Sequence, residues 1–435
     1  MVRSLRRVLI VGGGAAGVVT AATLLREADG NALDIEIVER RDTLGRGLAY
    51  GTRERVHLLN NYAGRMSAFE DDPGHLVRWC LARGRAVRPE TFLSRQTYGE
   101  YLSSLLAGVP GGSRVRHTRD EVVGLDDSGN DYVATLASGR QTAADLVVLA
   151  LGNPPPRDLP DVRRTARRYA ADPWAADLTE RVAPGSRVLL VGTGLTTVDV
   201  AAQITDTELD VEIVAISRHG LLPLRHRSRP PVACGRPVPA ERTLAAALRA
   251  VRAAGAGDPD HWRELVETVK AGFNERWQAL PYAEQQSFVR HVARYWEVAR
   301  HRMAPDMADL VEGLLLDGRL RVTTPTDVSV EDFDLVVNCT GPAPAATPGW
   351  NPLVDGMATR GMLRPGPHGL GLDIDRDGRL LDEAGVPARA IHVIGAARRG
   401  VEWEVAAIPD IRRQAKSVAG ALGVVPSDIS STLVG

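Results

Sequence analysis

A glycine-rich turn near the start of the chain holds the first residues whose types and spacing could do chemistry. Gly12, Gly14 and Gly17 follow the apolar run 8–11 with the spacing G-x-G-x-x-G, and a helical pattern then covers 18–25. The first glycine permits a tight turn, the second lets the backbone approach a pyrophosphate, and the third lets the helix pack close to the strand. The N-terminus of that helix would offer unpaired N–H groups to phosphates. The pattern therefore predicts a dinucleotide-binding turn.

An acidic residue at the end of the next strand supports this prediction. The run 35–38 is expected to be a strand, and it ends at Glu39, 22 residues after Gly17. In dinucleotide-binding domains a carboxylate near this position bonds a ribose hydroxyl. The alternative is a glycine-rich turn followed by an unrelated acid. The glycines, their flanking strand and helix, and the acid occur together here, which favours the dinucleotide site.

A second turn of this kind lies in the middle of the chain. Gly192 and Gly194 repeat the first two glycines, and Thr197 stands at the third position. A small residue can serve there if the helix sits slightly further from the strand. The next predicted strand ends in Ser217 and Arg218 instead of an acid, and these groups suit a 2′-phosphate. The turn therefore predicts an NADP site, unless Arg218 is simply a solvated arginine.

Two adjacent asparagines form a further candidate site. The loop 40–52 contains Gly45 and Gly47, which break any regular element and bring backbone close to another group. Asn60 and Asn61 follow an apolar pair and precede another loop. They are either ordinary turn residues or polar groups that face a ligand.

Basic residues gather in two other places. The loop 221–239 either closes over phosphates or is an exposed basic loop, and its basic residues are Arg225, His226, Arg227 and Arg229. Arg300, His301 and Arg302 are consecutive on an expected helix, so at most one or two of them can point into one site. His301 or Arg302 is a candidate anchor for a substrate carboxylate. The alternative is surface charge with one buried ion pair.

Composition and cysteine spacing exclude several classes of protein. A net charge of −1 over 435 residues argues against a nucleic-acid-binding protein. Cys80, Cys234 and Cys339 lie far apart, so neither a redox dithiol nor a metal site is expected. The first apolar run is too short for a signal peptide, and no run approaches the roughly 18 residues of a membrane span. A cytoplasmic protein without membrane contact is expected, and the sequence holds no signal for an oligomeric state.

The order of predicted elements indicates an α/β fold with two dinucleotide-binding, Rossmann-like domains. Buried strands at 146–151 and 334–338 each end in a glycine turn. One strand precedes the second dinucleotide-binding turn and the other follows it, which indicates two crossings between domains. The expected division is a first domain at 1–157 and 341–435, a second domain at 158–340, and a helical insert at 241–316. The insert's aromatic residues are expected to form a core, and they are Trp262, Phe273, Trp277, Phe288, Tyr295 and Trp296.

Taken together, these features resemble the flavoproteins with two dinucleotide-binding domains. More narrowly, the chain resembles the bacterial FAD/NAD(P)-binding family related to class B flavin monooxygenases, a group that includes N-hydroxylases and nitrosuccinate-forming enzymes. The segments that carry this likeness are GRGLAYGT, MSAFEDDPGH, SRHGLLPLRHR, RYWEVARHRM and WEVAAIPDIRRQA. The resemblance covers essentially the whole chain, and it is specific for architecture and cofactors but not for the substrate.

The resemblance implies FAD in the first domain and NADPH in the second. The residues it implies around FAD are Gly12, Gly14, Ala15, Ala16, Gly17, Glu39, Arg40, Gly45, Arg46, Gly47, Asn60, Val122, Gly152, Gly395 and Pro409, and Gly341 is a cofactor-binding residue not assigned to either cofactor. Those around NADPH are Gly192, Gly194, Thr196, Thr197, Ser217 and Arg218. A helix beginning near Pro409 would stabilise negative charge on the reduced flavin.

The resemblance also implies a reaction. NADPH would reduce the flavin, which would take up O2 at C4a and pass one oxygen to a small-molecule substrate, at an amine nitrogen. Asn60, or alternatively Asn61, would lie near the reacting position. The alternatives are oxygenation of sulfur or of a ketone (Baeyer–Villiger), an NADPH oxidase, a reductase that serves a partner, and a non-enzymatic nucleotide-binding regulator.

Overall fold

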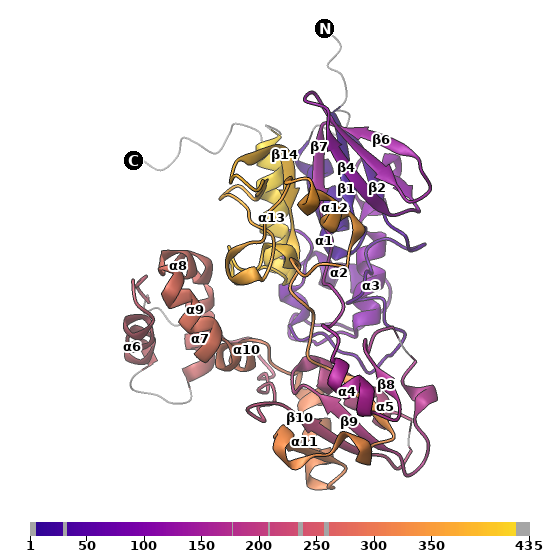
Figure 1. Cartoon of the computed structure of the whole chain (residues 1–435), viewed down its shortest axis with the longest axis vertical. Coiled ribbons are helices and arrows are strands. Elements are labelled where there is room, and N and C mark those ends of the chain that lie inside the picture. Colours follow the sequence, from indigo (N-terminus) through magenta and orange to yellow (C-terminus); the bar gives the residue numbers. More distant parts are fainter. Residues whose placement is uncertain are drawn as a thin grey trace.

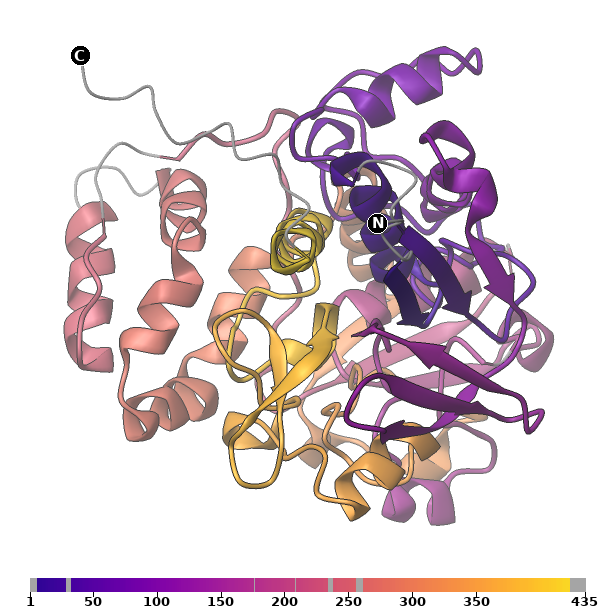
Figure 2. The same ribbon diagram turned by 90° about the horizontal axis from the view of Figure 1, so that it is seen from above.

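The computed structural model describes residues 6–28, 33–175, 177–207, 209–233, 238–255 and 261–422. Cys234 and part of the basic loop lie outside these residues. The described chain contains two parallel sheets, each with helices against it, and a group of helices that stands to one side (Figures 1 and 2). The predicted α/β fold with two Rossmann-like sheets is confirmed.

The first sheet combines strands from both ends of the chain. Its six strands run in the order β13-β14-β7-β1-β2-β3. Their bounds are Arg379–Leu381 (β13), Pro387–Val393 (β14), Leu146–Leu149 (β7), Arg6–Val11 (β1), Leu33–Val38 (β2) and Arg116–Thr118 (β3). All pairs are parallel except β13 with β14.

Strand β1 lies in the middle of the sheet, where its apolar side chains are buried on both faces. Val8, Leu9, Ile10 and Val11 are all buried, and Ile10 pairs with β2 on one side and β7 on the other. A continuous apolar run is the pattern of a parallel strand that is covered on both faces. The glycine turn after β1 thus lies at the middle of the sheet's carboxyl edge, where nucleotides bind in such folds.

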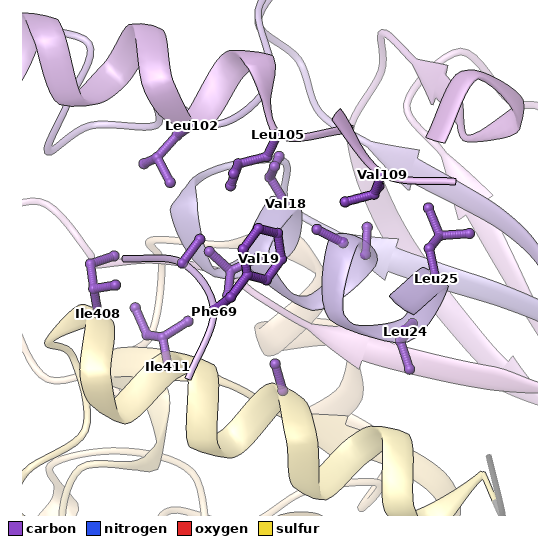
Figure 3. Close-up of a cluster of buried hydrophobic side chains, with 14 of the residues drawn as sticks. Val18, Val19, Leu24, Leu25, Phe69, Leu102, Leu105, Val109, Ile408 and Ile411 are labelled. Atoms are coloured by element: carbon purple, nitrogen blue, oxygen red, sulfur yellow. The ribbon is translucent and has the colours of Figure 1, made fainter. Parts of the chain in front are cut away.

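Helices cover one face of this sheet and a smaller sheet covers the other. Helices α1 (Ala15–Glu27), α3 (Arg95–Ser104) and α13 (Ile408–Ala421) enclose an apolar core (Figure 3). In this core Val18 of α1 lies beside Leu105, and Val19 lies beside Phe69 on the side of Ile408 and Ile411, so the first and last described helices pack together. The opposite face packs on β4 (Val122–Asp127), β5 (Tyr132–Leu136), β6 (Gln141–Ala144) and α12 (Pro352–Thr359).

The second sheet forms between β7 and β13 along the chain. Its order is β11-β10-β9-β12-β8, all parallel. The strand bounds are Leu320–Thr323 (β11), Glu212–Ile216 (β10), Arg187–Val191 (β9), Leu335–Asn338 (β12) and Tyr169–Ala170 (β8). Helices α5 (Leu195–Thr205) and α11 (Pro305–Leu316) pack together against one face. The chain therefore enters this domain after β7 and leaves it after β12.

Five helices of the predicted insert form a separate group beside the two sheets (Figure 1). They are α6 (Leu244–Gly255), α7 (Trp262–Lys270), α8 (Phe273–Ala279), α9 (Tyr282–His291) and α10 (Ala293–Arg300). Trp277 is 1% exposed in their core, whereas Tyr295 is 56% exposed, so the prediction of a core role was wrong for Tyr295. Helix α11 packs on α5 rather than with this group. None of the described helices combines the length and apolar character of a membrane span.

A buried ion pair joins the two sheet domains. Arg95 of α3 donates to Asp199 of α5 at 2.6 Å, and their side chains are 16% and 6% exposed. His57 Nε2 donates to the carbonyl oxygen of Asp199 at 3.1 Å. Burial, together with the charge of Arg95, lowers the pKa of His57 to about 4, so this imidazole is neutral near pH 7. The domain interface thus contains a buried carboxylate whose charge one guanidinium compensates.

This arrangement predicts that removing Arg95 costs more than removing both charged partners. Arg95→Leu leaves Asp199 buried without its cation and should lower the free energy of unfolding by about 3 kcal/mol. The double variant Arg95→Leu/Asp199→Leu should lose less than the single variant. Urea unfolding followed by tryptophan fluorescence measures both. Arg164→Leu, at an ion pair exposed by 74% and 88%, is the control and should change stability by less than about 0.5 kcal/mol.

Candidate functional site

Each central strand ends in a glycine turn that leads directly into a helix. In the first sheet Gly12 has a φ of +101°, and a Cβ there would lie 2.4 Å from the carbonyl oxygen of Ala150. A Cβ on Gly17 would lie 2.0 Å from the carbonyl oxygen of Gly12. Since both obstacles are backbone atoms, only glycine fits at these two positions. Gly12 therefore forms the predicted tight turn, and Gly17 allows the predicted close contact between helix and strand.

Gly14 differs from its two neighbours in the motif. Its φ is −71°, and a Cβ there would meet only the Cα of Gly47, at 3.5 Å. The protein alone would therefore accept a side chain at this position. Gly14 is the N-cap of α1, and no side chain caps that end of the helix. Its small size keeps the helix N-terminus open to an anion.

A cavity of about 450 Å³ lies at this turn. The predicted residues that line it are Gly12, Gly14, Glu39, Arg40, Gly47, Val122 and Gly152. Glu39 is 8% exposed, and its carboxylate accepts bonds from the N–H groups of Gly13 and Arg41, both at 3.0 Å. These bonds fix the carboxylate in the cavity wall. Sequence reasoning missed Asp172, Trp174, Trp350 and Asn351, which also line the cavity and carry no motif.

Other predicted residues support the first turn from behind. The N–H of Gly45 donates to the carbonyl oxygen of Gly13 at 2.7 Å. A Cβ on Gly45 would lie 2.6 Å from the backbone of Leu102 in α3, so this glycine seats the loop and does not line the cavity. Arg46 follows it, half-buried, and its Nε has no hydrogen-bond partner in the described chain.

The turn after β14 lies against the start of α1. A Cβ on Gly395 would lie 3.8 Å from the Cβ of Ala16, which follows Ala15 at the start of α1. The N–H of Gly395 donates to Gln414 of α13 at 2.8 Å. Pro409 lies in the first turn of α13, and no side chain caps that helix. Two helix N-termini, those of α1 and α13, therefore lack side-chain caps in one region of the first domain.

The second turn repeats the first with one substitution. Gly192 has a φ of +128°, and a Cβ there would lie 2.2 Å from the carbonyl oxygen of Cys339. The hydroxyl of Thr197 donates to the carbonyl oxygen of Gly192 at 2.7 Å. Where Gly17 must lack a side chain, Thr197 bonds the equivalent carbonyl. Gly194 is the N-cap of α5, has no side-chain cap, and has open space around its missing Cβ.

A second cavity, of about 550 Å³, lies at this turn. The predicted residues that line it are Gly192, Gly194, Thr196, Ser217, Arg218 and Gly341. The hydroxyls of Thr193 and Ser217 lie 2.8 Å apart and connect the glycine turn to the end of β10. Sequence reasoning missed Arg294 and Glu297, which line this cavity from α10.

The two predicted asparagines lie beside the basic loop rather than in either cavity wall. Asn61 Oδ1 accepts the N–H of Tyr62 at 3.0 Å, which is turn chemistry. The carbonyl oxygen of Asn60 accepts a bond from His226 Nε2 at 3.0 Å. The hydroxyl of Tyr62 donates to the carbonyl oxygen of Arg227 at 2.8 Å. The asparagine turn and the basic loop therefore hold each other in place.

In the described part of the basic loop, two arginines pair with carboxylates on neighbouring helices. Arg225 pairs with Asp309 of α11, and Arg227 donates to Glu264 of α7 at 2.8 Å. His226 between them is buried. Arg225 and Arg227 thus point toward α11 and α7, whereas His226 points inward to the turn at Asn60. Arg227 and Arg229 are exposed, as the interpretation of an exposed basic loop expects, and closure over phosphates stays a prediction.

The three consecutive basic residues at the end of α10 turn to three different places. Arg300 donates from Nε to Glu404 at 3.0 Å. His301 Nε2 lies 2.9 Å from Glu297, and its ring lines the second cavity. Arg302 follows the end of the helix, so helical periodicity no longer governs its direction. The expectation that these three side chains cannot share one site is confirmed.

Arg302 is the most deeply buried of the three. Its side chain is 1% exposed, and Nη2 donates to Glu267 at 2.8 Å. Its Nε and Nη1 are buried and have no hydrogen-bond partner in the described chain. Arg65 donates to the other oxygen of Glu267 at 2.9 Å, so two guanidinium groups share one carboxylate. The group carries one excess positive charge and unpaired donors, which suits an anion.

The residues at both turns fit a dinucleotide. Each turn leads into a helix whose N-terminus has no side-chain cap, and the protein itself does not require a glycine at Gly14 or Gly194. Glu39 suits a ribose hydroxyl in the first cavity, whereas Arg218 suits a 2′-phosphate in the second. Within the described residues, no three His, Cys, Asp or Glu side chains gather in a way that could hold a metal ion.

Gly14 provides a test that separates cofactor binding from folding. We expect Gly14→Ala to fold as the unchanged protein does but to bind FAD at least about tenfold more weakly, because only the ligand needs the missing methyl. FAD affinity by fluorescence titration and melting of the FAD-free protein measure the two effects. Gly12→Ala is the contrast, and it should fail to fold. Unchanged FAD affinity in Gly14→Ala would show that phosphates do not approach this turn.

His226 predicts how stability depends on pH. Burial, with the nearby cation Arg302, lowers the pKa of His226 to about 3, whereas the unfolded chain titrates near 6.5. Between these values the unfolded chain binds a proton that the fold excludes. The contribution of His226 is therefore full above pH 6.5 and falls at lower pH, by about 1.4 kcal/mol per unit.

Replacing this imidazole should flatten the loss of stability in acid. Urea unfolding from pH 7 to pH 5 should show a shallower loss for His226→Gln than for the unchanged protein. His291→Gln, at an exposed position at the end of α9, should keep the original slope. Equal slopes for all three proteins would mean that His226 binds its proton as readily in the fold as in the unfolded chain.

Comparisons with known proteins agree with this geometry. Residues 9–154 match the family described as FAD-NAD(P)-binding. The L-aspartate N-monooxygenase (nitrosuccinate-forming) of Streptomyces davaonensis is 29% identical over 231 residues, which cover 41% of this chain and 35% of that protein. The match therefore spans about a third of the length of that curated relative.

Solved structures match over most of the chain. The ornithine hydroxylase of Pseudomonas aeruginosa has a TM-score of 0.63 at 15% identity, covering 96% of this chain and 98% of that one. The ornithine N-hydroxylase of Kutzneria sp. 744, solved with reduced FAD, NADP⁺ and L-ornithine, has a TM-score of 0.61 at 15% identity, covering 96% and 99%. Residues 9–154 thus match a FAD-NAD(P)-binding family, and the chain as a whole shares its fold with these two ornithine hydroxylases.

Proposed function

We propose that this protein is an FAD- and NADPH-dependent monooxygenase that hydroxylates the amine nitrogen of an amino acid or a related small molecule. The balanced reaction is R–NH2 + O2 + NADPH + H⁺ → R–NHOH + H2O + NADP⁺. The observation that carries the proposal is the pair of cavities, one at the central glycine turn of each parallel sheet. The names of the relatives, which act on aspartate and ornithine, favour an amino acid.

The two cavities divide the cofactors between them. In the first, Glu39 would accept bonds from the ribose of FAD, and Gly14 would let the pyrophosphate reach α1. In the second, Ser217 and Arg218 would hold the 2′-phosphate of NADPH. When bound, FAD supplies the chemistry of accepting hydride from NADPH and activating O2. The protein supplies position, charge and the exclusion of water.

The uncapped start of α13 is suited to negative charge on a reduced cofactor. Pro409 begins a helix whose first N–H groups have no side-chain cap, and Gly395 brings this region against α1. The segment before it is held by the helical insert: Trp277 donates to the carbonyl oxygen of Gly400 at 2.8 Å, and Asn274 accepts the N–H of Glu404 at 2.9 Å. The insert thereby orders the backbone that leads into α13.

Arg302 is the proposed anchor for the substrate carboxylate. Its buried Nε and Nη1 lack a protein acceptor, and a carboxylate oxygen at either nitrogen would accept a charge-assisted hydrogen bond. Asn60, joined to the same region through His226, is the proposed polar contact near the reacting position, with Asn61 confined to its turn. The partners are thus an amino-acid-like substrate and O2, and a cytoplasmic location belongs to the proposal because NADPH is supplied there.

The first experiment measures NADPH oxidation, O2 uptake, peroxide and hydroxylamine product with the FAD-loaded protein. We expect NADPH to be preferred over NADH and one of L-aspartate or L-ornithine to yield one hydroxylamine per NADPH. Peroxide as the sole product with every amine tested would make the protein an oxidase. NADPH oxidation without O2 uptake would make it a reductase, and no reaction with either nucleotide would contradict both cavities' assigned roles.

The same assay tests Arg302 with a matched pair of substrates. Arg302→Gln should lower kcat/KM for the accepted amino acid by about ten- to a hundredfold, the loss of a charge-assisted hydrogen bond. The corresponding amine without the carboxylate should react equally slowly with both proteins. An equal loss for both substrates would assign Arg302 to the architecture of the site.

A further inference from the structure

One face of α10 belongs to the second cavity and the other face belongs to the insert. Arg294, Glu297, Val298 and His301 line the cavity, with the spacing i, i+3, i+4, i+7 that places side chains on one face of a helix. Trp296 and Arg300 point elsewhere, and both bond Glu404. A helix outside both sheet domains therefore supplies part of the wall of the nucleotide cavity.

Arg294 reaches the glycine turn itself. Its Nη2 donates to the hydroxyl of Thr193 at 3.0 Å and also bonds the carbonyl oxygen of Leu221. Thr193 stands between the two glycines of the turn, and its hydroxyl lies 2.8 Å from that of Ser217. One side of the guanidinium is thus fixed to the phosphate-binding loop, while the residue as a whole lines the cavity.

The charges around the cavity favour a polyanion. Arg218, His219, Arg294 and His301 line it, and Glu297 is the one acid among its described lining residues. Burial raises the pKa of Glu297, but His301 and Arg399 outweigh that effect, so the net pKa lies below its ordinary value. The carboxylate is thereby paired with Arg399 at 2.6 Å and lies 2.9 Å from His301 Nε2, which leaves Arg218 and Arg294 for a ligand.

We propose that α10 is part of the NADP(H) site, with Arg294 as a ligand of the pyrophosphate and His301 as a second contact on the same face. The inference rests on the proposed use of NADP(H). Arg294 is assigned to the pyrophosphate because it is fixed to the turn between Gly192 and Gly194, whereas Arg218 stands at the end of β10, at the 2′-phosphate.

This assignment links the nucleotide to the segment before α13. Glu297 faces the second cavity and also bonds Arg399, and Arg300 on the same helix bonds Glu404. A nucleotide that holds α10 therefore also holds residues 399–404. We expect NADP⁺ to slow hydrogen exchange in 293–301 and, through these ion pairs, in 399–404.

The test compares the FAD-loaded protein with Arg294→Gln, Arg294→Lys and Arg218→Gln, by titration calorimetry with NADP⁺ and with adenosine 2′-monophosphate, which has no pyrophosphate. Arg294→Gln should bind NADP⁺ about tenfold or more weakly and with a smaller dependence on salt, but should bind adenosine 2′-monophosphate unchanged. Arg294→Lys should recover part of the affinity. Arg218→Gln should weaken both ligands. Arg290→Gln, on the preceding helix and exposed, is the matched control.

The outcomes separate this inference from the proposed function. Normal NADP⁺ affinity in Arg294→Gln overturns the inference and leaves the function intact. Equal weakening of both ligands, with unchanged salt dependence, also overturns it, because Arg294 would then only shape the loop. If the unchanged protein binds no NADP⁺, the proposed function fails first. Should Arg294→Gln not fold, His301→Gln decides: weaker NADP⁺ binding supports the role of α10, and unchanged binding overturns it.

Discussion

The structure depends on how closely a helix can approach the strand before it. At the first turn this contact is so tight that a Cβ on Gly17 would lie 2.0 Å from the carbonyl oxygen of Gly12. That approach sets the position of α1, and α1 in turn carries α13 and the core they share (Figure 3). The first described helix thereby fixes the place of the last one, and Gly395 lies between them, against Ala16 of α1 and bonded to Gln414 of α13.

The second domain answers the same constraint with another residue. The hydroxyl of Thr197 donates to the carbonyl oxygen of Gly192, whereas a side chain at Gly17 would collide with the equivalent carbonyl oxygen of Gly12. In both turns the middle glycine, Gly14 or Gly194, leaves the helix N-terminus clear. The residue allowed at the third position therefore depends on the distance between helix and strand. The glycine at the middle position is not required by the protein's own packing, and a bound phosphate would explain it.

The sequence was informative where structure is local. A strand, a turn and a helix are set by neighbouring residues, so the two cradles, Glu39 and the pair Ser217 and Arg218 could be predicted at their correct places in the two sheets. Trp174 and Trp350 reach the first cavity only through tertiary packing, and no spacing marks them. Tyr295 has the pattern of a core residue but faces solvent, because the helix beside it leaves that side uncovered.

The end of α10 explains why residue type alone could not locate the substrate site. Successive residues on a helix differ by about 100°, which sends Arg300 and His301 to different neighbours. The helix then ends, and Arg302 takes a direction that no period predicts. Each of the three basic groups meets its own carboxylate, so the helix has one orientation in which all are paired. The charged cluster thus contacts three different parts of the fold, and in the described chain Arg302 keeps two buried nitrogens without an acceptor, which is why we propose it as the substrate anchor.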